Sequence, residues 1–507
     1  MKKLVVLLLT LSTLVGTVAC GATEKPANND ASSAAPAASS EAAASSEAPV
    51  EEKTVEKIVF WTNSFASDPN VSAVICEEFK EATGIELEWV SYPKEDYEDI
   101  MMAALMSCKE DELPDIIAAP DNLGVLLRQE MLYDISGLIE NNEGIKALIE
   151  RNPSITAEYE MGDGSIYALA SSNFQSMTIW TRQDLLDAMG AKQPTTIDEF
   201  TQLLRDIKVA YPDMIPLTSP MSLKVLEVMS NAFGVQYSII QDENGTFYDP
   251  TLTDEYKEFM DWIKMLYEEG LIDKELPTNT SYGSIRSKYN DGKAVMTVMW
   301  DNTWQTFQSA MDKNTGGTVG FVEPFETEDG VFGVHYKNAS APYVMTTGVD
   351  PELAQQIFDA FYGWMYLDPK GVETSTYGPR DYSWEVVDGA YKSKDGYDIG
   401  VSMQSVPPVD PDYVYDFTIG EYAQKRADVS AYIRNVVIQH EEKVMKPFLF
   451  FEHVDYAGIA SDTDSYRTEL FYLYITGQKD YDYFVKEYKA RVAEIGLEDI
   501  LADMNAK

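Results

Sequence analysis

A strand–helix–strand pattern between residues 57 and 118 restricts the fold more than any other feature of this sequence. Its strands are short runs rich in β-branched and aromatic residues, and its helices carry apolar side chains at helical spacing, with Gly84 ending the first helix. Strands joined by such a helix are parallel, with a right-handed crossover. The body of the chain therefore begins as an open α/β sheet. The predicted elements are a strand at 57–61, a helix at 71–82, a strand at 85–89, a helix at 97–106 and a strand at 115–119.

Polar and aromatic residues stand where these predicted strands end. Trp61 and Asn63 stand at the end of the first strand, and Tyr92 follows the second. Asp121 comes shortly after the third. Ligands of open α/β sheets bind beyond the carboxyl ends of the strands. We therefore expect a ligand site at this edge of the sheet.

Three later helices have start signals or a clear apolar face. Thr196, with Glu199 three residues later, forms a capping box ahead of an apolar stripe. Residues 256–267 carry apolar side chains at helical spacing. Asp350 followed by Pro351 predicts an N-cap and a proline at the first helical position of another helix.

The first twenty residues have the composition of an export signal. Lys2 and Lys3 form a positive start, residues 4–18 are mostly apolar, and Ala19 precedes Cys20. This apolar run is shorter than the roughly 20 residues that cross a bilayer as a helix. No later stretch is long and apolar enough to replace it, so we expect a chain that is exported but does not span the membrane.

Residues 17–20 resemble the lipobox of bacterial lipoproteins, although Thr17 stands where that family prefers leucine. The resemblance implies a lipid on Cys20, which would hold the protein on the outer face of the cell membrane. Residues 21–54 are an Ala, Ser, Glu and Pro stretch without apolar periodicity, and we expect it to be a disordered tether.

The charge of the chain excludes one class of partner. The net charge is −45, and it becomes −47 when Lys2 and Lys3 leave with the signal. Nucleic acids and anionic lipid surfaces bind clustered lysine and arginine, so both are poor partners for this chain. The excess of acid is typical of a soluble protein at a cell surface.

Few residues are available for metal or covalent chemistry. Cys76 and Cys108 fall in apolar helical patterns, and either a disulfide or two buried thiols would fit. Residues 440–444 lack the second histidine of a zinc protease helix, and no serine elbow, phosphate loop or C-x-x-C is present. Residues 462–464 with Glu469 faintly suggest a calcium loop but lack its central glycine, which favours a solvated turn.

Several segments along the body resemble one protein family when they are taken in order. They are residues 79–85, 113–117, 163–169, 182–186, 194–200 and 292–296. In this order they are similar to the extracellular solute-binding proteins of ATP-driven importers, in the family that receives carbohydrates. The resemblance implies an α/β fold of the type II periplasmic-binding-protein-like class, with two interleaved lobes joined by two or three hinge segments.

The resemblance also implies lobe boundaries and a function. The first lobe should comprise residues 55–171 plus about 340–445, and the second residues 172–339 plus about 446–507, with crossings near 170–174, 336–341 and Met445. A carbohydrate ligand would close the two lobes without any chemistry or cofactor. The closed receptor, a monomer, would deliver the ligand to an ABC permease, and only the lipid anchor would touch the membrane.

Residues 377–385 resemble a segment of the larger lipoprotein members assigned to complex oligosaccharides, which usually have Glu-Gly where Arg380-Asp381 stands. Sugars present apolar faces and a rim of hydroxyls, so their receptors use flat aromatics and short polar groups. Trp300 beside Asp301 at the end of a strand predicted at 294–300 is the leading candidate. The full set of candidate ligand residues is Trp61, Asn63, Asp121, Asn173, Trp300, Asp301, Tyr377, Arg380 and Trp384.

Three alternatives stay open on the sequence alone. Peptide and other solute receptors share the expected fold. A surface glycoside hydrolase needs only two carboxylates at roughly 5 to 10 Å, and the chain has 84 acidic residues. An adhesin for a surface polymer would share the anchor and the tether but would not need two hinged lobes.

Overall fold

A computed structural model places most of the body of the chain. It describes residues 53–63, 69–92, 97–109, 112–118, 123–156, 159–170, 175–220, 222–242, 244–279, 282–337, 342–387, 390–394, 422–440 and 453–506. These residues belong to one compact unit, Lys53–Lys507. The expected signal, Cys20 and nearly all of the expected tether lie outside the described residues.

The first sheet has five strands in the order β2-β1-β3-β14-β4. β1 pairs in parallel with β2 along its whole length and with β3, so the predicted parallel start of the body is confirmed. β14 pairs antiparallel with both β3 and β4. The strands are β1 (Lys57–Asn63), β2 (Glu86–Tyr92), β3 (Ile116–Ala118), β4 (Ala168–Ala170) and β14 (Pro342–Met345).

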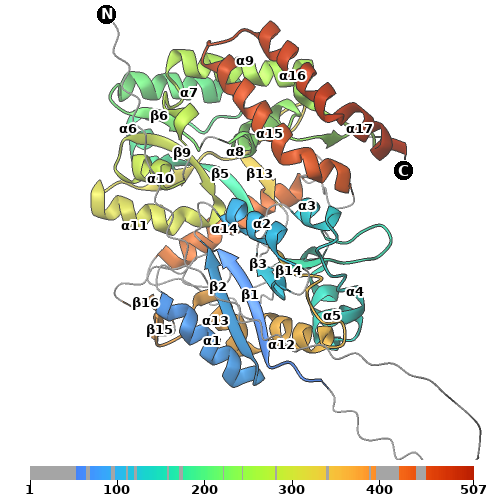
Figure 1. Cartoon of the computed structure of the whole chain (residues 1–507). Helices are drawn as coiled ribbons and strands as arrows, with labels where there is room; N and C mark the ends of the chain where they lie inside the picture. Colours follow the sequence, from blue (N-terminus) through green and yellow to red (C-terminus); the bar gives the residue numbers. More distant parts are fainter. Residues whose placement is uncertain are drawn as a thin grey trace, which may run out of the picture. The chain divides into compact units, whose positions relative to one another are not determined.

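Helices cover both faces of this sheet, because successive side chains of a strand point to opposite faces. Ile58 and Phe60 of β1 pack in one apolar cluster, and Val59 and Trp61 pack in another. The first cluster is covered by α1 (Pro69–Thr83), α4 (Ser136–Glu140), α5 (Glu143–Arg151) and α12 (Ala354–Tyr366), and the second by α2 (Tyr97–Ser107) and α3 (Leu123–Arg128). We call this sheet with its helices the first lobe (Figure 1).

The second sheet is built around β5. The order is β10-β5-β9-β6, and β13 also pairs with β5. β10, β13 and β9 are antiparallel to β5, whereas β6 and β9 are parallel to each other. The strand predicted at 294–300 is confirmed as β9. The strands are β5 (Gln175–Arg182), β6 (Ile215–Thr218), β9 (Ala294–Trp300), β10 (Val319–Phe321) and β13 (Val334–Lys337).

Both faces of the second sheet are also buried. Met177 and Ile179 of β5 pack with α6 (Gln183–Met189), α7 (Ile197–Ala210), α8 (Leu223–Ser230) and α9 (Asp254–Glu269). Trp180 of β5 points to the other face, which α10 (Tyr282–Asn290), α11 (Trp304–Asn314) and α14 (Tyr422–Gln439) cover. We call this sheet with its helices the second lobe (Figure 1).

The helix α14 belongs by its packing to the second lobe. Its side chains Val429 and Ile433 are buried in the cluster of Trp180. The expected first lobe, which extends to about residue 445, includes this helix. Periodicity along the chain shows that a helix has an apolar face, but it does not show which sheet that face covers.

The remaining α-helices and strands of the described chain lie outside the two main sheets and the helices named so far. They are α13 (Pro369–Tyr377), α15 (Val454–Ile475), α16 (Tyr481–Ile495), α17 (Leu497–Ala506), the ribbons β7 (Ile240–Gln241) with β8 (Phe247–Tyr248), β11 (Phe325–Glu326) with β12 (Val331–Phe332), and β15 (Trp384–Val387) with β16 (Ala390–Ser393). α15 and α16 lie side by side (Figure 1).

The chain passes between the two sheets more than once. β4 and β14 belong to the first sheet and β5 and β13 to the second, so residues 171–174 and 338–341 connect the sheets. These two segments and Met445 lie outside the described residues. The lobes are therefore interleaved in sequence, as the α/β two-lobed fold class requires.

The capping prediction for α7 is confirmed in part. Thr196 caps the helix by accepting a hydrogen bond from the Glu199 N–H at 3.1 Å. The Glu199 carboxylate, however, accepts from the N–H of Thr195 at 2.8 Å. The return bond of the capping box is thus displaced by one residue.

The start predicted for α12 is wrong. The helix begins at Ala354, three residues after Pro351. Asp350 instead closes a local turn, since its carboxylate accepts from the Glu352 N–H at 3.0 Å, and Lys53 bonds the same side chain at 3.0 Å. Aspartate serves such turns as readily as helix caps, so the dipeptide did not discriminate between them.

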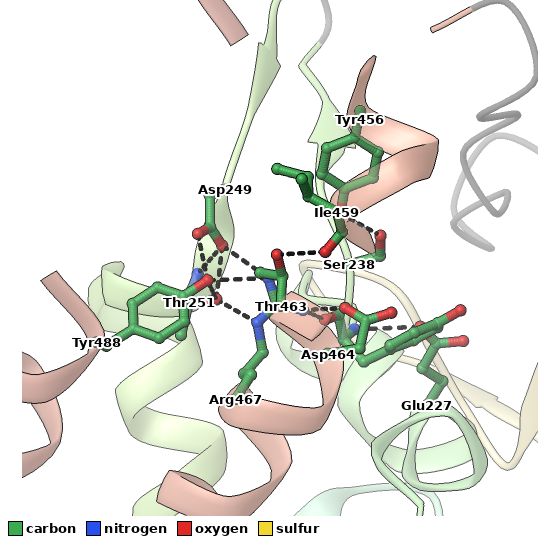
Figure 2. Close-up of polar contacts among 11 residues, drawn as sticks. Glu227, Ser238, Asp249, Thr251, Tyr456, Ile459, Thr463, Asp464, Arg467 and Tyr488 are labelled. Carbon is green, nitrogen blue, oxygen red and sulfur yellow. Dashed lines mark hydrogen bonds and ion pairs between the residues drawn. The ribbon is translucent and has the colours of Figure 1, made fainter. Parts of the chain in front are cut away.

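A buried arginine holds α15 to the second lobe. Arg467 is 0% exposed and donates to Thr251 Oγ1 at 2.7 Å, to Asp464 at 2.7 Å and to the Tyr488 hydroxyl at 3.0 Å (Figure 2). Asp249 lies 3.4 Å from the guanidinium and accepts from the Tyr488 hydroxyl at 2.5 Å. The network thus joins α15 to α16 and to the turn that precedes α9.

The same network reaches the sheet through one backbone segment. The carbonyl of Tyr237 accepts from Arg467, and its N–H donates to Glu227 on α8 at 3.2 Å. Glu227 lies 2.7 Å from His335 Nε2 on β13, and both side chains are 3% exposed. The opposite end of α15 contacts the first lobe, where Arg128 of α3 donates to the Asp455 carbonyl at 2.9 Å.

The charge of Arg467 is held in place by its neighbours. Burial opposes a charged guanidinium, but Tyr488, Asp249 and Asp464 hold the pKa of Arg467 well above its ordinary value. A buried ion pair is weak evidence for stability when intact, yet removing one partner leaves an uncompensated buried charge. Asp249 and Asp464 therefore depend on Arg467 for the positive charge that compensates theirs.

Replacing Arg467 by methionine should lower the free energy of unfolding by about 3–5 kcal/mol, because Asp249 and Asp464 lose their cation. Urea denaturation followed by circular dichroism measures the loss. Arg491→Met is the matched control, since Arg491 bonds Asp462 and Glu494 on the surface and should cost far less. Equal losses in both variants would contradict the role assigned to Arg467.

Candidate functional site

Several strands of each sheet end at one common edge. In the first sheet, β1, β2, β3 and β4 run in the same direction, and Ala170 at the end of β4 is the last described residue before the connection at 171–174. The carboxyl ends of β1 to β3 therefore lie at the edge where the chain leaves for the second sheet. This is the edge at which the sequence predicted a ligand site.

The second sheet has the same arrangement. β5 starts at Gln175, directly after the connection, and its third residue Met177 pairs with Trp300 at the end of β9. On the other side of β5, Lys337 at the end of β13 pairs with Gln175. β6, parallel to β9, ends at the same edge with Thr218 beside Thr297. We call these two edges, one on each sheet, the crossing edges.

The candidate residues of the first crossing edge differ in accessibility. Trp61 is 9% exposed and packs edge-to-face against Tyr92, with ring centroids 5.3 Å apart. Tyr92 is only half-buried, although burial raises its pKa, with Cys108 adding to the effect. The backbone of Asn63 pairs with Tyr92 at the end of β1, and its side chain is outside the description. Tyr92 is thus the more accessible aromatic of the pair.

The candidate residues of the second crossing edge are Trp300 and Asp301. Trp300 ends β9, is half-buried, and packs against the apolar clusters on both faces of the sheet. Its carbonyl accepts from Trp180 Nε1 at 3.2 Å, which holds the strand end in place. Asp301 follows at the start of a 3₁₀ turn and is fully buried. Trp300 therefore combines a rigid backbone with a partly accessible ring.

A polar cluster at the end of β6 was not predicted. Asp273 accepts from Thr218 Oγ1 at 2.8 Å and from Asn279 Nδ2 at 3.0 Å. Lys288 completes the cluster, 2.7 Å from Asp273 and 2.7 Å from Glu275. Asp273, Glu275 and Asn279 are close in sequence, but Thr218 and Lys288 come from other elements, and each residue resembles an ordinary surface position. Only Thr218 carries a sequence signal, because it is the last residue of β6, which ends at the crossing edge.

The cluster pairs one lysine with two carboxylates. Burial raises the pKa of Asp273, but the hydrogen bonds from Lys288 and Asn279 outweigh it, so the pKa lies below its ordinary value of 3.8. Burial likewise lowers the pKa of Lys288, and the bonds to Asp273 and Glu275 reverse the shift, so its pKa lies above 10.5. Both groups are therefore ionised near neutral pH.

The structure brings together three other candidates, Tyr377, Arg380 and Trp384. The rings of Tyr377 and Trp384 lie 5.8 Å apart, and both are buried. Trp384 Nε1 donates to the Gly378 carbonyl at 2.7 Å, and the Arg380 guanidinium lies 5.0 Å from the Trp384 ring centroid. Arg380 also pairs with Glu373 of α13. Arg380, half-buried, is thus the accessible member of this group.

The turn at Asp381 keeps a glycine-like backbone. Its φ of 66° lies in the left-handed region that favours glycine, and its N–H donates to the Trp384 carbonyl at 2.6 Å. Lys394 bonds the carbonyl of Asp381 from the other side. A left-handed backbone therefore stands at Asp381, where the resembling segments usually carry glycine.

Asp121 and Asn173 lie outside the described residues, as does Cys20. The structure thus groups Tyr377, Arg380 and Trp384, and it places Trp61 and Trp300 on different sheets.

Cys76 and Cys108 are half-buried free thiols, and burial raises the pKa of Cys76 to about 11.

The segment that faintly suggested a calcium loop is helical. Residues 462–464 and Glu469 belong to α15, and Asp464 and Asp462 bond Arg467 and Arg491. The expected solvated turn is therefore wrong.

Within the described ranges, no group of three or more His, Cys, Asp or Glu side chains could hold a metal ion. In the same part of the chain, no helix combines the length and the apolar character needed to cross a bilayer.

Comparison with known proteins identifies one family. Residues 75–363 match the family described as bacterial extracellular solute-binding protein. The fructooligosaccharide ABC transporter substrate-binding protein FusA of Streptococcus pneumoniae serotype 4 is 24% identical over 280 residues, which cover 50% of this chain and 51% of that protein. The polygalacturonan/rhamnogalacturonan-binding protein YtcQ of Bacillus subtilis (strain 168) is 26% identical over 233 residues, 43% of this chain and 45% of that protein. The chain thus spans about half the length of the curated relatives it matches.

Solved structures share the fold over most of the chain. The alginate-binding protein AlgQ2 without calcium ion gives a TM-score of 0.67 at 19% identity, covering 89% of this chain and 98% of that one. FusA in complex with kestose gives 0.62 at 20% identity, covering 88% and 97%. These likenesses show the two-lobed α/β fold of solute-binding proteins. Because the family match spans more than half of the 507 residues, the chain belongs to the bacterial extracellular solute-binding protein family.

Proposed function

We propose that the protein is the substrate-binding component of an ABC importer, which captures an oligosaccharide between its lobes and delivers it to a membrane permease. The observation that carries the proposal is the pair of crossing edges, each bearing a partly accessible aromatic residue, Tyr92 on one sheet and Trp300 on the other. Aromatic rings stack on the apolar faces of sugars. Ligand contacts from both edges would exist only when the lobes close.

The comparisons support a carbohydrate ligand. The relatives are named for fructooligosaccharide and for polygalacturonan or rhamnogalacturonan, and the similar structures for alginate and kestose. All of these ligands are carbohydrates. The relatives are also named as binding proteins, which supports binding without catalysis.

The mechanism is a shift between open and closed lobes. A ligand that contacts both crossing edges binds the closed form better, so it raises the closed population by its difference in affinity. The buried network at Arg467 supports this mechanism because it keeps α15 rigid within the second lobe, while Arg128 bonds the start of α15 from the first lobe.

We also propose that the protein is a monomer held at the outer face of the cell membrane by a lipid on Cys20. Membership in an extracellular family supports the location, and a similar protein of Bacillus subtilis (strain 168), 25% identical over 267 residues, is named lipoprotein LipO. A lipid anchor would keep the receptor near its permease without a spanning helix.

A thermal-shift screen against neutral and acidic oligosaccharides, with amino acids and short peptides as controls, tests the proposal. At a hundredfold excess over Kd, a true ligand adds about 2.7 kcal/mol to the free energy of unfolding, which raises Tm by several degrees. A shift with one saccharide class is the expected result. A shift with peptides alone would move the protein to another class of solute receptor, and product formation from an oligosaccharide would identify a hydrolase.

Replacing Trp300 by alanine should abolish saccharide binding in isothermal titration and leave a cooperatively folded protein, because Trp300 is only partly buried. Trp384→Ala is the comparison, since that ring is 0% exposed and its loss should cost about 3–5 kcal/mol of stability. Retained binding by Trp300→Ala would remove Trp300 from the site.

Replacing Cys20 by serine should move the protein from the membrane pellet to the soluble fraction and abolish labelling by radioactive palmitate. Cys76→Ser is the matched control and should stay in the pellet, because Cys76 is a half-buried thiol of α1. Membrane retention of the Cys20→Ser variant would contradict lipidation at this residue.

A further inference from the structure

We propose that His335 is a positioning residue of the ligand site, and that the receptor holds its saccharide more tightly when the His335 ring is protonated. The inference rests on the proposed function and adds a proton-sensitive residue to it. The His335 side chain is 3% exposed and lies on β13, two residues before the end of that strand. It therefore acts on the ligand through the strands around it and does not touch the ligand itself.

The position of His335 in the second sheet links it to Trp300. His335 of β13 pairs with Met177 of β5, and Met177 pairs with Trp300 at the end of β9. The three residues form one row across neighbouring strands, and residues directly opposite each other in antiparallel strands share one face of the sheet. Because hydrogen bonds join these strands, a change in the position of β13 reaches the strand end that carries Trp300.

The backbone of His335 joins the two strands at which the chain crosses between the sheets. Its carbonyl accepts from Ser176 Oγ at 2.7 Å, and Ser176 is fully buried. β5 begins directly after the crossing at 171–174, and β13 ends directly before the crossing at 338–341. The Ser176–His335 bond thus ties both crossing strands together in the second lobe.

The side chain of His335 holds the same strand to α8. Its Nε2 lies 2.7 Å from a carboxyl oxygen of Glu227. Within the described part of the chain, Nδ1 is buried and has no hydrogen-bond partner, so the orientation of the ring depends on the bond to Glu227. Glu227 also accepts from the Tyr237 N–H at 3.2 Å, and the Tyr237 carbonyl accepts from Arg467 of α15. The bond thus connects β13 to the buried network of α15.

Carboxyl groups outnumber cations among the described groups of this network. Glu227 and Asp464 both face the buried Tyr237, since both add to the effect of burial in raising its pKa. Arg467 bonds Asp464 at 2.7 Å and lies 3.4 Å from Asp249 (Figure 2). These described groups comprise three carboxyls and one guanidinium. A positive imidazole ring beside them reduces the excess of acid.

Other titratable groups belong to the elements around the ring. Lys224 of α8 and Lys337 of β13 have side chains outside the description. Tyr256 of α9 also faces the Glu227 carboxyl, which adds to the effect of burial in raising the Tyr256 pKa. α14 packs against the other face of β13, where Val334 is buried. The sheet therefore separates α14 from the imidazole.

A proton on Nδ1 changes the strength of the bond to Glu227. The neutral ring keeps its hydrogen on Nε2 and donates it to the carboxylate, so the proton that is gained or lost is the one on Nδ1. With that proton the bond joins two opposite charges, and without it the buried carboxylate loses its cation. Histidine is the side chain that changes charge between about pH 5 and pH 8. We therefore expect α8 to hold β13 more firmly in mild acid than in mild base.

Hydrogen exchange of the ligand-free protein tests the hold on β13. The amides of β13 and β5 are followed at about pH 6 and about pH 8, and the rates are corrected for the intrinsic effect of pH. We expect the protection of the wild-type protein to fall about fivefold at the higher pH, because loss of the proton favours local opening. Protection that is equal at both pH values would overturn the inference.

A matched set of variants assigns the effect to one residue. His335→Gln should show no pH dependence, because a glutamine amide donates a hydrogen bond but does not change charge. His440→Gln is the control and should behave as the wild-type protein, since His440 pairs with Glu326 at 2.7 Å and is 28% exposed. If His335→Gln fails to fold, Glu227→Gln replaces it, because that variant removes the carboxylate and should also lose the pH dependence. Equal pH dependence in the wild-type protein and the His335→Gln variant would contradict the role of His335.

Isothermal titration then tests the ligand, with kestose and trigalacturonate as probes. We expect the wild-type protein to bind whichever saccharide it accepts about fivefold more tightly at pH 6 than at pH 8, and His335→Gln to bind it equally at both. Affinity that changes in the same way in both proteins would overturn this inference and leave the proposed function intact. Binding of neither probe, nor of any saccharide in the thermal-shift screen, would overturn the proposed function and this inference together.

Discussion

The hydrogen-bond register of β5 is the constraint on which the second lobe and its site depend. β5 pairs with β9, β10 and β13, so nearly the whole sheet is bonded to this strand. Met177 stands in register between His335 of β13 and Trp300 of β9. A slip of one residue would turn every side chain of β5 to the other face. This register places Trp300 beside the point where the chain enters from the first sheet.

Buried charge gives the second lobe its rigidity where α15 joins it. Arg467 binds residues from three separate parts of the chain (Figure 2). Glu227, paired with His335, continues the contacts to β13. Each of these groups is nearly inaccessible, so each needs its partner. The same helix touches α3 of the first lobe at Asp455. An arrangement of this kind suits a receptor whose lobes move as bodies.

Ion pairs hold one candidate ligand residue, Arg380, and the lysine of the cluster at the end of β6, Lys288. Arg380 and Lys288 are basic, and both are held by carboxylates. At the crossing edges, Tyr92 and Trp300 are partly accessible aromatic residues. Aromatic rings can stack on the apolar faces of sugars.

Local pattern was sufficient for part of this protein. Periodicity predicted the parallel order of β1, β2 and β3 and the bounds of β9, and short-range hydrogen bonding predicted the Thr196 cap. The family resemblance rested on several short sequence segments that occur in the family's order along the chain. The export signal was predicted from composition and the lipid on Cys20 from the resemblance to the lipobox, and both stay predictions because these residues lie outside the described part of the chain. Only the tertiary structure decided that Trp384 is fully buried, that α14 covers the second sheet, and that Glu373 neutralises Arg380. Those outcomes depend on contacts between residues or surfaces that the chain brings together only on folding, and no periodicity in a single sequence encodes which surfaces will meet.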